Sequence, residues 1–118
     1  MVRTEDVIEN LRAKNLREAH ALALRRQAAH EEGVRLASIL LREHPESVRV
    51  WGFGSTFETW RHYRADSDID LAVENGDAGN LLKIVECSSF EVDVVVLADV
   101  PESMSSFIRT QGALLGAL

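Results

Sequence analysis

The sequence is poor in the residues that build disulfide frameworks, membrane spans and linkers. It has one cysteine, Cys87, so no disulfide can form within the chain. It has two prolines, and no apolar run approaches the ~20 residues that a membrane-spanning helix needs. We also find no basic and apolar leader and no internal repeat. These absences argue against a disulfide-stapled secreted domain or a membrane protein, and we expect one cytoplasmic domain, residues 1–118.

Basic residues are scarce in the second part of the chain. Residues 1–50 hold nine Lys and Arg against eight Asp and Glu, whereas residues 51–118 hold four against eleven. Non-specific affinity for nucleic acid comes from neutralising phosphates with basic side chains. We therefore expect no direct nucleic-acid binding, and an acidic surface that attracts divalent cations.

The first 45 residues carry a helical pattern. Apolar side chains recur at helix spacing, and Pro45 is expected to end the helix. Gly33 lies inside this pattern and either breaks the helix or weakens it, since an interior glycine costs roughly 1 kcal/mol relative to alanine. Residues 1–45 are thus predicted to form a helical N-terminal part, followed by an α+β core over residues 48–115.

Three runs in the core have strand character. Residues 48–51 are mostly β-branched and aromatic. In residues 69–74 apolar side chains alternate along the run, and residues 90–97 are rich in valine. A short helix capped by Asp77 is expected between the last two runs. A final helix is expected after Pro101, with an apolar stripe formed by Met104, Phe107, Ile108 and Leu115.

The first strand ends in a turn suited to phosphate. Gly54 permits positive φ or a close backbone approach, and Ser55 adds a hydroxyl group. Backbone N–H groups exposed at a strand-to-helix junction are good donors to phosphate oxygens. The pair Gly54 and Ser55 is therefore a candidate phosphate-binding turn.

Three aspartates interrupt the apolar strand runs. Strand period two places Asp68 and Asp70 on one face, about 7 Å apart at Cα for a rise of ~3.3 Å per residue. Asp93 interrupts the third run in the same way, on the face opposite Val92, Val94 and Val96. Like charges at this spacing repel each other unless a cation lies between them, and carboxylate with phosphate oxygens are the ligands that Mg²⁺ prefers. A lone Asp-x-Asp is also common in turns, so the indication comes from the combination of features.

These residues resemble the signature of the minimal nucleotidyltransferases of the DNA polymerase beta-like superfamily. That signature is Gly-Ser, about ten residues, Asp-x-Asp and a later strand carboxylate, and here Gly54-Ser55, Asp68-Ile69-Asp70 and Asp93 occupy the corresponding places. The resemblance covers residues 48–115. It implies an α+β fold with a small mixed sheet, helices packed on one face and an N-terminal helical extension.

The resemblance also implies roles for the site residues. Asp68, Asp70 and Asp93 would be catalytic and would hold two Mg²⁺ ions, while Gly54 and Ser55 would grip the phosphates of ATP. Ser67 would belong to the nucleotide site. The reaction would be in-line displacement at the α-phosphorus, with pyrophosphate leaving.

The connection between the two motifs differs from the family pattern. Twelve residues, 56–67, separate Gly-Ser from Asp-x-Asp, and the usual second glycine and basic residue are absent. Arg61 and Arg64 could supply positive charge to the phosphates from this longer connection. Trp60 and Tyr63 are either packed residues or a stacking surface for a nucleobase.

Three functional interpretations follow. The first is an antitoxin that transfers AMP from ATP to a tyrosine of a HEPN-type helical partner. The chain is too small to carry an evident acceptor-binding domain, so we expect that partner or a homo-oligomer to supply it. The second is a non-catalytic subunit that binds a nucleotide or masks a partner by contact. The third is an antibiotic-modifying nucleotidyltransferase, on which the sequence is nearly silent.

Overall fold

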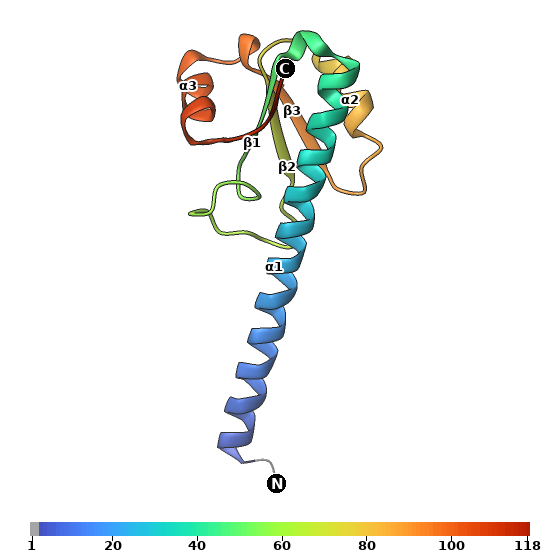
Figure 1. Ribbon diagram of the computed structural model, residues 1–118. Coiled ribbons are helices and arrows are strands. Elements are labelled where there is room, and N and C mark those ends of the chain that lie inside the picture. The colour runs from blue at the N-terminus through green and yellow to red at the C-terminus, as the bar shows by residue number, and fades with distance from the viewer. Residues whose placement is uncertain (1–2) are drawn as a thin grey trace.

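The chain folds into a small sheet with one very long helix, as the computed structural model of residues 3–118 shows (Figure 1). In chain order the helices and strands are α1 (Thr4–Glu43), β1 (Arg49–Phe53), β2 (Ile69–Val73), α2 (Ala78–Val85), β3 (Val92–Val96), α3 (Glu102–Gln111) and β4 (Ala113–Ala117). Single 3₁₀ turns at Pro45–Ser47 and Leu97–Asp99 precede β1 and follow β3. The predicted α+β class and helical N-terminal part are confirmed.

The four strands form a mixed sheet in the order β3-β2-β1-β4. β1 pairs antiparallel with β2 and with β4, and β2 pairs parallel with β3. A parallel pair needs a crossover between its strands, and α2 supplies it. The crossover brings the start of β2 and the start of β3 to the same end of the sheet.

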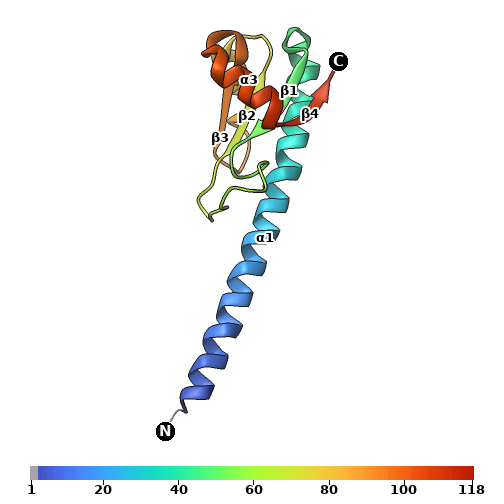
Figure 2. The same cartoon turned by 90° about the vertical axis from the view of Figure 1, so that its left-hand side faces the viewer.

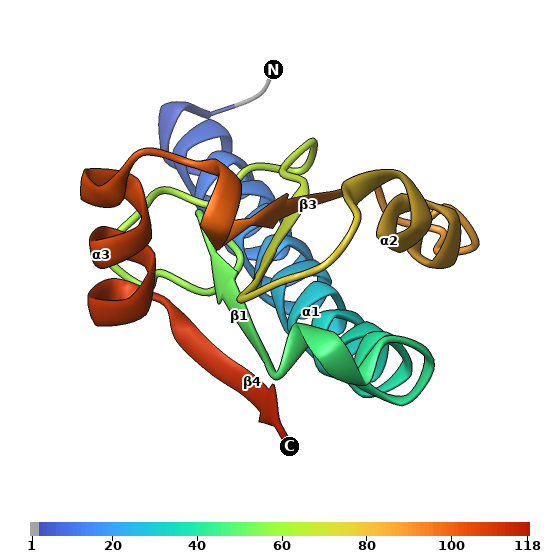
Figure 3. The ribbon, with the colours of Figure 1, turned by 90° about the horizontal axis from the view of Figure 1, so that it is seen from above.

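Strand alternation divides the core into two layers. Val50, Leu71 and Val94 face α1 and α2. Trp51 and Ala72 face the other way and pack against Ile108 of α3. Seen from above, the sheet lies between α3 on one side and α1 with α2 on the other (Figure 3). The expectation that the helices pack on one face therefore needs correction for α3, because the second face also presents apolar side chains that need cover.

Helix α1 runs without interruption through Gly33. The glycine is buried, and a Cβ atom built there would lie only 2.5 Å from Cζ of Phe57. The ring of Phe57 fills the space beside the helix and belongs to the larger core cluster. Gly33 thus permits close packing of the connection between β1 and β2 onto α1, and it does not break the helix.

The first half of α1 projects from the body as an arm, which we define as residues 4–21. Every one of these residues is exposed, and the first fully buried residue of the helix is Ala29. The arm makes the molecule elongated, with principal extents of 66 × 30 × 21 Å (Figure 2). Exposed apolar side chains on the arm include Val7, Ile8, Leu11 and Leu16.

The C-terminal segment differs from its prediction. The last helix ends at Gln111, and Leu115 lies in strand β4 rather than on a helical stripe. The turn between them depends on Gly112, where a Cβ atom would lie 2.5 Å from the carbonyl oxygen of Ile108. Of the predicted stripe, Ile108 is buried, whereas Met104 and Phe107 are exposed.

Candidate functional site

The sheet brings the three aspartates to one end of one face. Asp70 of β2 is the register partner of Asp93 of β3, and Asp68 lies two residues earlier, immediately before β2. Asp70 points away from α1, since its neighbours Ile69 and Leu71 point into the core beneath that helix. Asp93 does the same because its neighbour Val94 belongs to that core, and the charge of Asp68 acts on Asp70 from the residues before the strand. The predicted sharing of one face by these carboxylates is therefore confirmed.

The electrostatic setting of Asp70 favours its protonated form. The pKa of Asp70 is raised from 3.8 to about 6, first by burial and then by the charges of Asp93, Asp68 and Glu58 in that order. The charge of Arg61 acts in the opposite direction. These effects show that the carboxylates are close enough to repel one another.

The candidate phosphate turn touches this group directly. Gly54 follows β1 with φ +76°, a left-handed conformation that L side chains rarely adopt. A Cβ atom on Gly54 would collide with the carboxylate of Asp70. Ser55 follows at once and is half-buried. The glycine is thus needed both for the backbone angle and for the approach of the turn to Asp70.

Glu58 is a site residue that the sequence did not indicate. Its side chain is 1% exposed, and its Oε2 accepts hydrogen bonds from the Gly54 amide and from Nε of Arg61, the latter at 2.9 Å. Its Oε1 is buried and has no hydrogen-bond partner. No motif signalled Glu58, because its burial depends on how the connection between β1 and β2 folds back on itself.

Ser67 and Arg64, the remaining predicted nucleotide-binding residues, make their contacts within the loop between β1 and β2. Oγ of Ser67 accepts a hydrogen bond from the Arg64 amide at 2.9 Å. The Arg64 side chain is 73% exposed and lies 3.9 Å from Asp66. Its ion pair is therefore with Asp66 rather than with the three aspartates of the candidate site. Thr56 donates its hydroxyl hydrogen to the carbonyl oxygen of Asp68 at 3.0 Å, which ties the turn to the start of β2.

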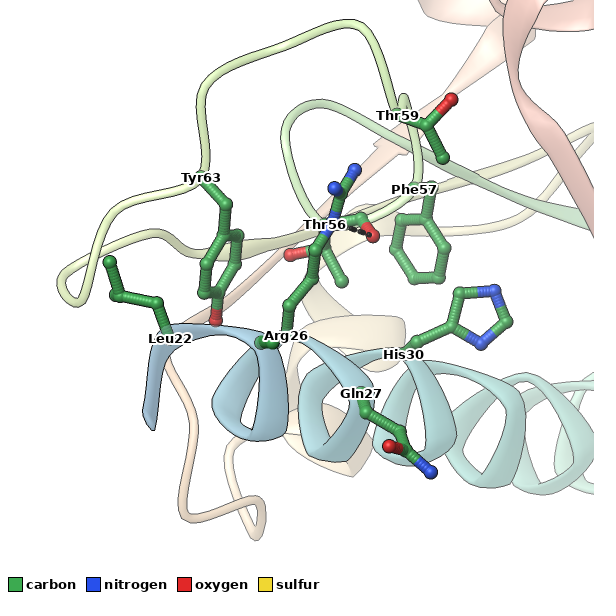
Figure 4. Close-up of a pocket in the computed structure, with 9 residues that line it drawn as sticks. Leu22, Arg26, Gln27, His30, Thr56, Phe57, Thr59 and Tyr63 are labelled. Atoms are coloured by element: carbon green, nitrogen blue, oxygen red, sulfur yellow. Dashed lines mark hydrogen bonds between the residues drawn. The ribbon is translucent and has the colours of Figure 1, made fainter. Parts of the chain in front are cut away.

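A cavity of about 460 Å³ lies behind the turn, between α1 and residues 56–63. Tyr63 is buried in its wall beside Arg26, whose guanidinium lies 5.9 Å from the ring centroid (Figure 4). Tyr63 therefore packs on α1 and does not belong to the face of the aspartates, whereas Trp60 is exposed. The cavity is lined by Leu22, Ala23, Arg26, Gln27, His30, Thr56, Phe57, Thr59 and Tyr63.

No ready-made metal cage is present in residues 3–118. Within that span, no three His, Cys, Asp or Glu side chains are grouped so that they alone could hold an ion. Mg²⁺ does not require such a cage, because it commonly binds one or two carboxylates together with substrate phosphates and water. No helix in the same span is long and apolar enough to cross a membrane.

Comparison with known proteins adds one decisive observation. No protein-family model matches the chain, and no curated protein matches it in sequence. A crystal structure of a toxin-antitoxin with AMP-PNP superposes with a TM-score of 0.57 at 26% identity, over 72% of this chain and 73% of that one. The fold is one found in toxin–antitoxin structures.

The toxin-antitoxin MntA-HepT has the same fold. Its crystal structure gives a TM-score of 0.50 at 23% identity, over 78% of this chain and 73% of the other. Both matches cover most of the chain, so the similarity concerns the whole fold rather than one motif.

Proposed function

We propose that this protein is a Mg²⁺-dependent nucleotidyltransferase that transfers AMP from ATP to a tyrosine of a HEPN-type toxin and thereby acts as an antitoxin. One observation carries the proposal. Asp70 lies in register with Asp93, beside the Gly54 turn, in a chain that shares its fold with a toxin-antitoxin solved with AMP-PNP. The resemblance of the same residues to the minimal nucleotidyltransferase signature also supports it.

The donor set at this end of the sheet suits Mg²⁺. Asp68, Asp70 and Asp93 offer hard oxygen ligands, and repulsion from the charges of Asp93 and Asp68 adds to burial in raising the pKa of Asp70. A bound cation would remove that repulsion. Bound there with the triphosphate, Mg²⁺ would supply charge neutralisation at the phosphates and orientation for in-line displacement.

The chain's own residues would perform the remaining tasks. The Gly54–Ser55 turn would hold phosphate oxygens with its amides and the Ser55 hydroxyl group. Asp93 would accept the proton of the acceptor hydroxyl as its oxygen bonds to the α-phosphorus. The bond from that phosphorus to the bridging oxygen breaks, and pyrophosphate leaves with the electron pair.

A mass measurement tests the transfer. The purified protein is incubated with its HEPN-type toxin, ATP and Mg²⁺, and we expect the intact mass of the toxin to rise by one or more AMP groups. The Asp93→Asn variant should abolish this increase. Asp77→Asn is the matched control, since it removes a remote carboxylate while asparagine still caps α2 as well as aspartate does. An unmodified toxin with the wild-type protein would contradict the proposal.

A second candidate function is masking of the toxin by contact. The observation that favours it is the connection of residues 56–67 between the two motifs, which is longer than in the family and lacks the second glycine. Neutralisation of the toxin by the Asp68→Asn/Asp93→Asn double variant would support masking. Complex formation without neutralisation by that variant would support the enzyme.

A further inference from the structure

Two of the donors that suit a phosphate oxygen are already bound to a carboxylate of this chain. The Gly54 amide and the Arg61 guanidinium both donate to the same oxygen, Oε2 of Glu58. A backbone N–H and a guanidinium are also the pair of donors that proteins commonly offer to a phosphate. The carboxylate of Glu58 thus occupies an anion-binding position inside the candidate site.

The Glu58 carboxylate is poorly satisfied in this position. Its Oε1 is buried without a hydrogen-bond partner, although the side chain is only 1% exposed. An unsatisfied buried acceptor lowers stability, and more so when the group is charged.

The contacts that hold Glu58 can open without unfolding a helix or a strand. Residues 54–68, which connect β1 to β2, contain no helix or strand. The Arg61 side chain is 48% exposed, so its half of the ion pair is already in contact with solvent. Opening this pair therefore does not require any strand or helix to unfold.

We propose that Glu58 is an internal competitor for the nucleotide: its carboxylate holds Gly54 and Arg61 until a triphosphate oxygen replaces it. This inference rests on the proposed function, because it concerns the same nucleotide site. The exchange swaps one oxyanion for another on the same two donors. Glu58 consequently sets how tightly the free protein binds ATP.

Calorimetric titration with Mg·ATP tests the competition. Glu58→Gln keeps the shape of the side chain but removes its charge, and a neutral amide holds the two donors more weakly than a carboxylate. We expect the Kd for Mg·ATP to fall by about tenfold or more. Glu86→Gln, an equal charge change at an exposed residue after α2, should leave the Kd unchanged. Thermal unfolding of both variants checks that the fold is intact.

Amide NMR of the free proteins tests the contact without any nucleotide. The Gly54 amide proton should resonate far downfield in the wild type and move upfield in Glu58→Gln but not in Glu86→Gln. A Gly54 resonance that does not move overturns the inference. Binding of Mg·ATP that is equal or weaker in Glu58→Gln also overturns it, and leaves the proposed function standing. Absence of Mg·ATP binding in both proteins, free and with the toxin, counts against the proposed function itself.

Discussion

At the scale of single residues, Asp70 illustrates how a position in the candidate site opposes stability. Its carboxylate is partly buried beside Asp93 and Asp68, and these surroundings raise its pKa to about 6. An acid whose pKa is higher in the folded state than in the unfolded state contributes stability only while it is protonated. The contribution is complete below pH 3.8 and is lost as the pH rises through about 6.

We therefore predict that Asp70→Asn stabilises the metal-free protein at neutral pH. Asparagine stays neutral, so the variant should gain about 1–2 kcal/mol over the wild type at pH 7.5, after allowance for screening by solvent. At pH 4 the two proteins should be nearly equal. Urea unfolding in EDTA at both pH values measures the difference. An equal effect from Asp66→Asn, which alters an exposed carboxylate, would contradict this explanation.

At the scale of elements, α3 depends on few contacts for its place on the sheet. Ile108 packs into the smaller core cluster, and Oγ of the buried Ser105 donates to the carbonyl oxygen of Leu97 at 2.8 Å. Arg109 adds a hydrogen-bonded ion pair with Glu74 of the chain just after β2, at 2.7 Å. The last pair is partly exposed and contributes little compared with the buried contacts.

Ser105→Ala should consequently weaken the attachment of α3. Removal of the hydroxyl group leaves the carbonyl of Leu97 without its partner, and we expect a loss of about 1 kcal/mol in the free energy of unfolding. Ser106→Ala is the matched control. The Ser106 side chain is exposed, and its replacement by alanine gives the same gain in helix propensity. Chemical denaturation of both variants measures the effect. Equal stabilities would show that the Ser105 hydrogen bond contributes nothing.

At the scale of the whole molecule, the arm of α1 lacks the packing that stabilises the rest of the chain. Most of the stability of helices in proteins comes from tertiary packing, and none of residues 4–21 is buried. Residues 29–41 of the same helix instead contribute Ala29, Leu36 and Leu40 to the core. One continuous helix thus has two parts of very different stability.

Hydrogen exchange should resolve these two parts. We predict that backbone amides of residues 4–21 exchange many times faster than those of residues 29–41, because the arm can open locally without disturbing the core. Exchange followed by mass spectrometry on peptides from both ranges provides the measurement. Equal protection along the helix would mean that the arm is packed against another molecule in solution.

The sequence predicted the features that depend on local periodicity. Alternation at period two placed Asp70 and Asp93 opposite the apolar faces of their strands, and this holds in the sheet. Pro45 marked the end of α1 correctly, within two residues. The glycine at position 54 also indicated a special backbone angle before the structure gave it. Each of these features follows from a residue and its near neighbours in the chain.

Other features could not be predicted because they depend on residues far apart in sequence. The segment 113–117 favours helix by composition and becomes strand β4 because β1 offers it a free edge. Gly33 is required by the ring of Phe57, which lies 24 positions further along. Tyr63 packs on Arg26 of α1 rather than near the aspartates, and this contact also joins residues that lie far apart in the sequence.

The sequence by itself therefore determined the α+β class, the strand faces and the three aspartates of the candidate site, since short-range spacing fixes all of them. The tertiary structure alone decided that Asp70 pairs with Asp93 and that Glu58 returns to the Gly54 amide. It also decided that α3 covers the second face and that the arm extends beyond the core. These outcomes depend on strand register, burial and long-range packing, which no local pattern in the chain encodes.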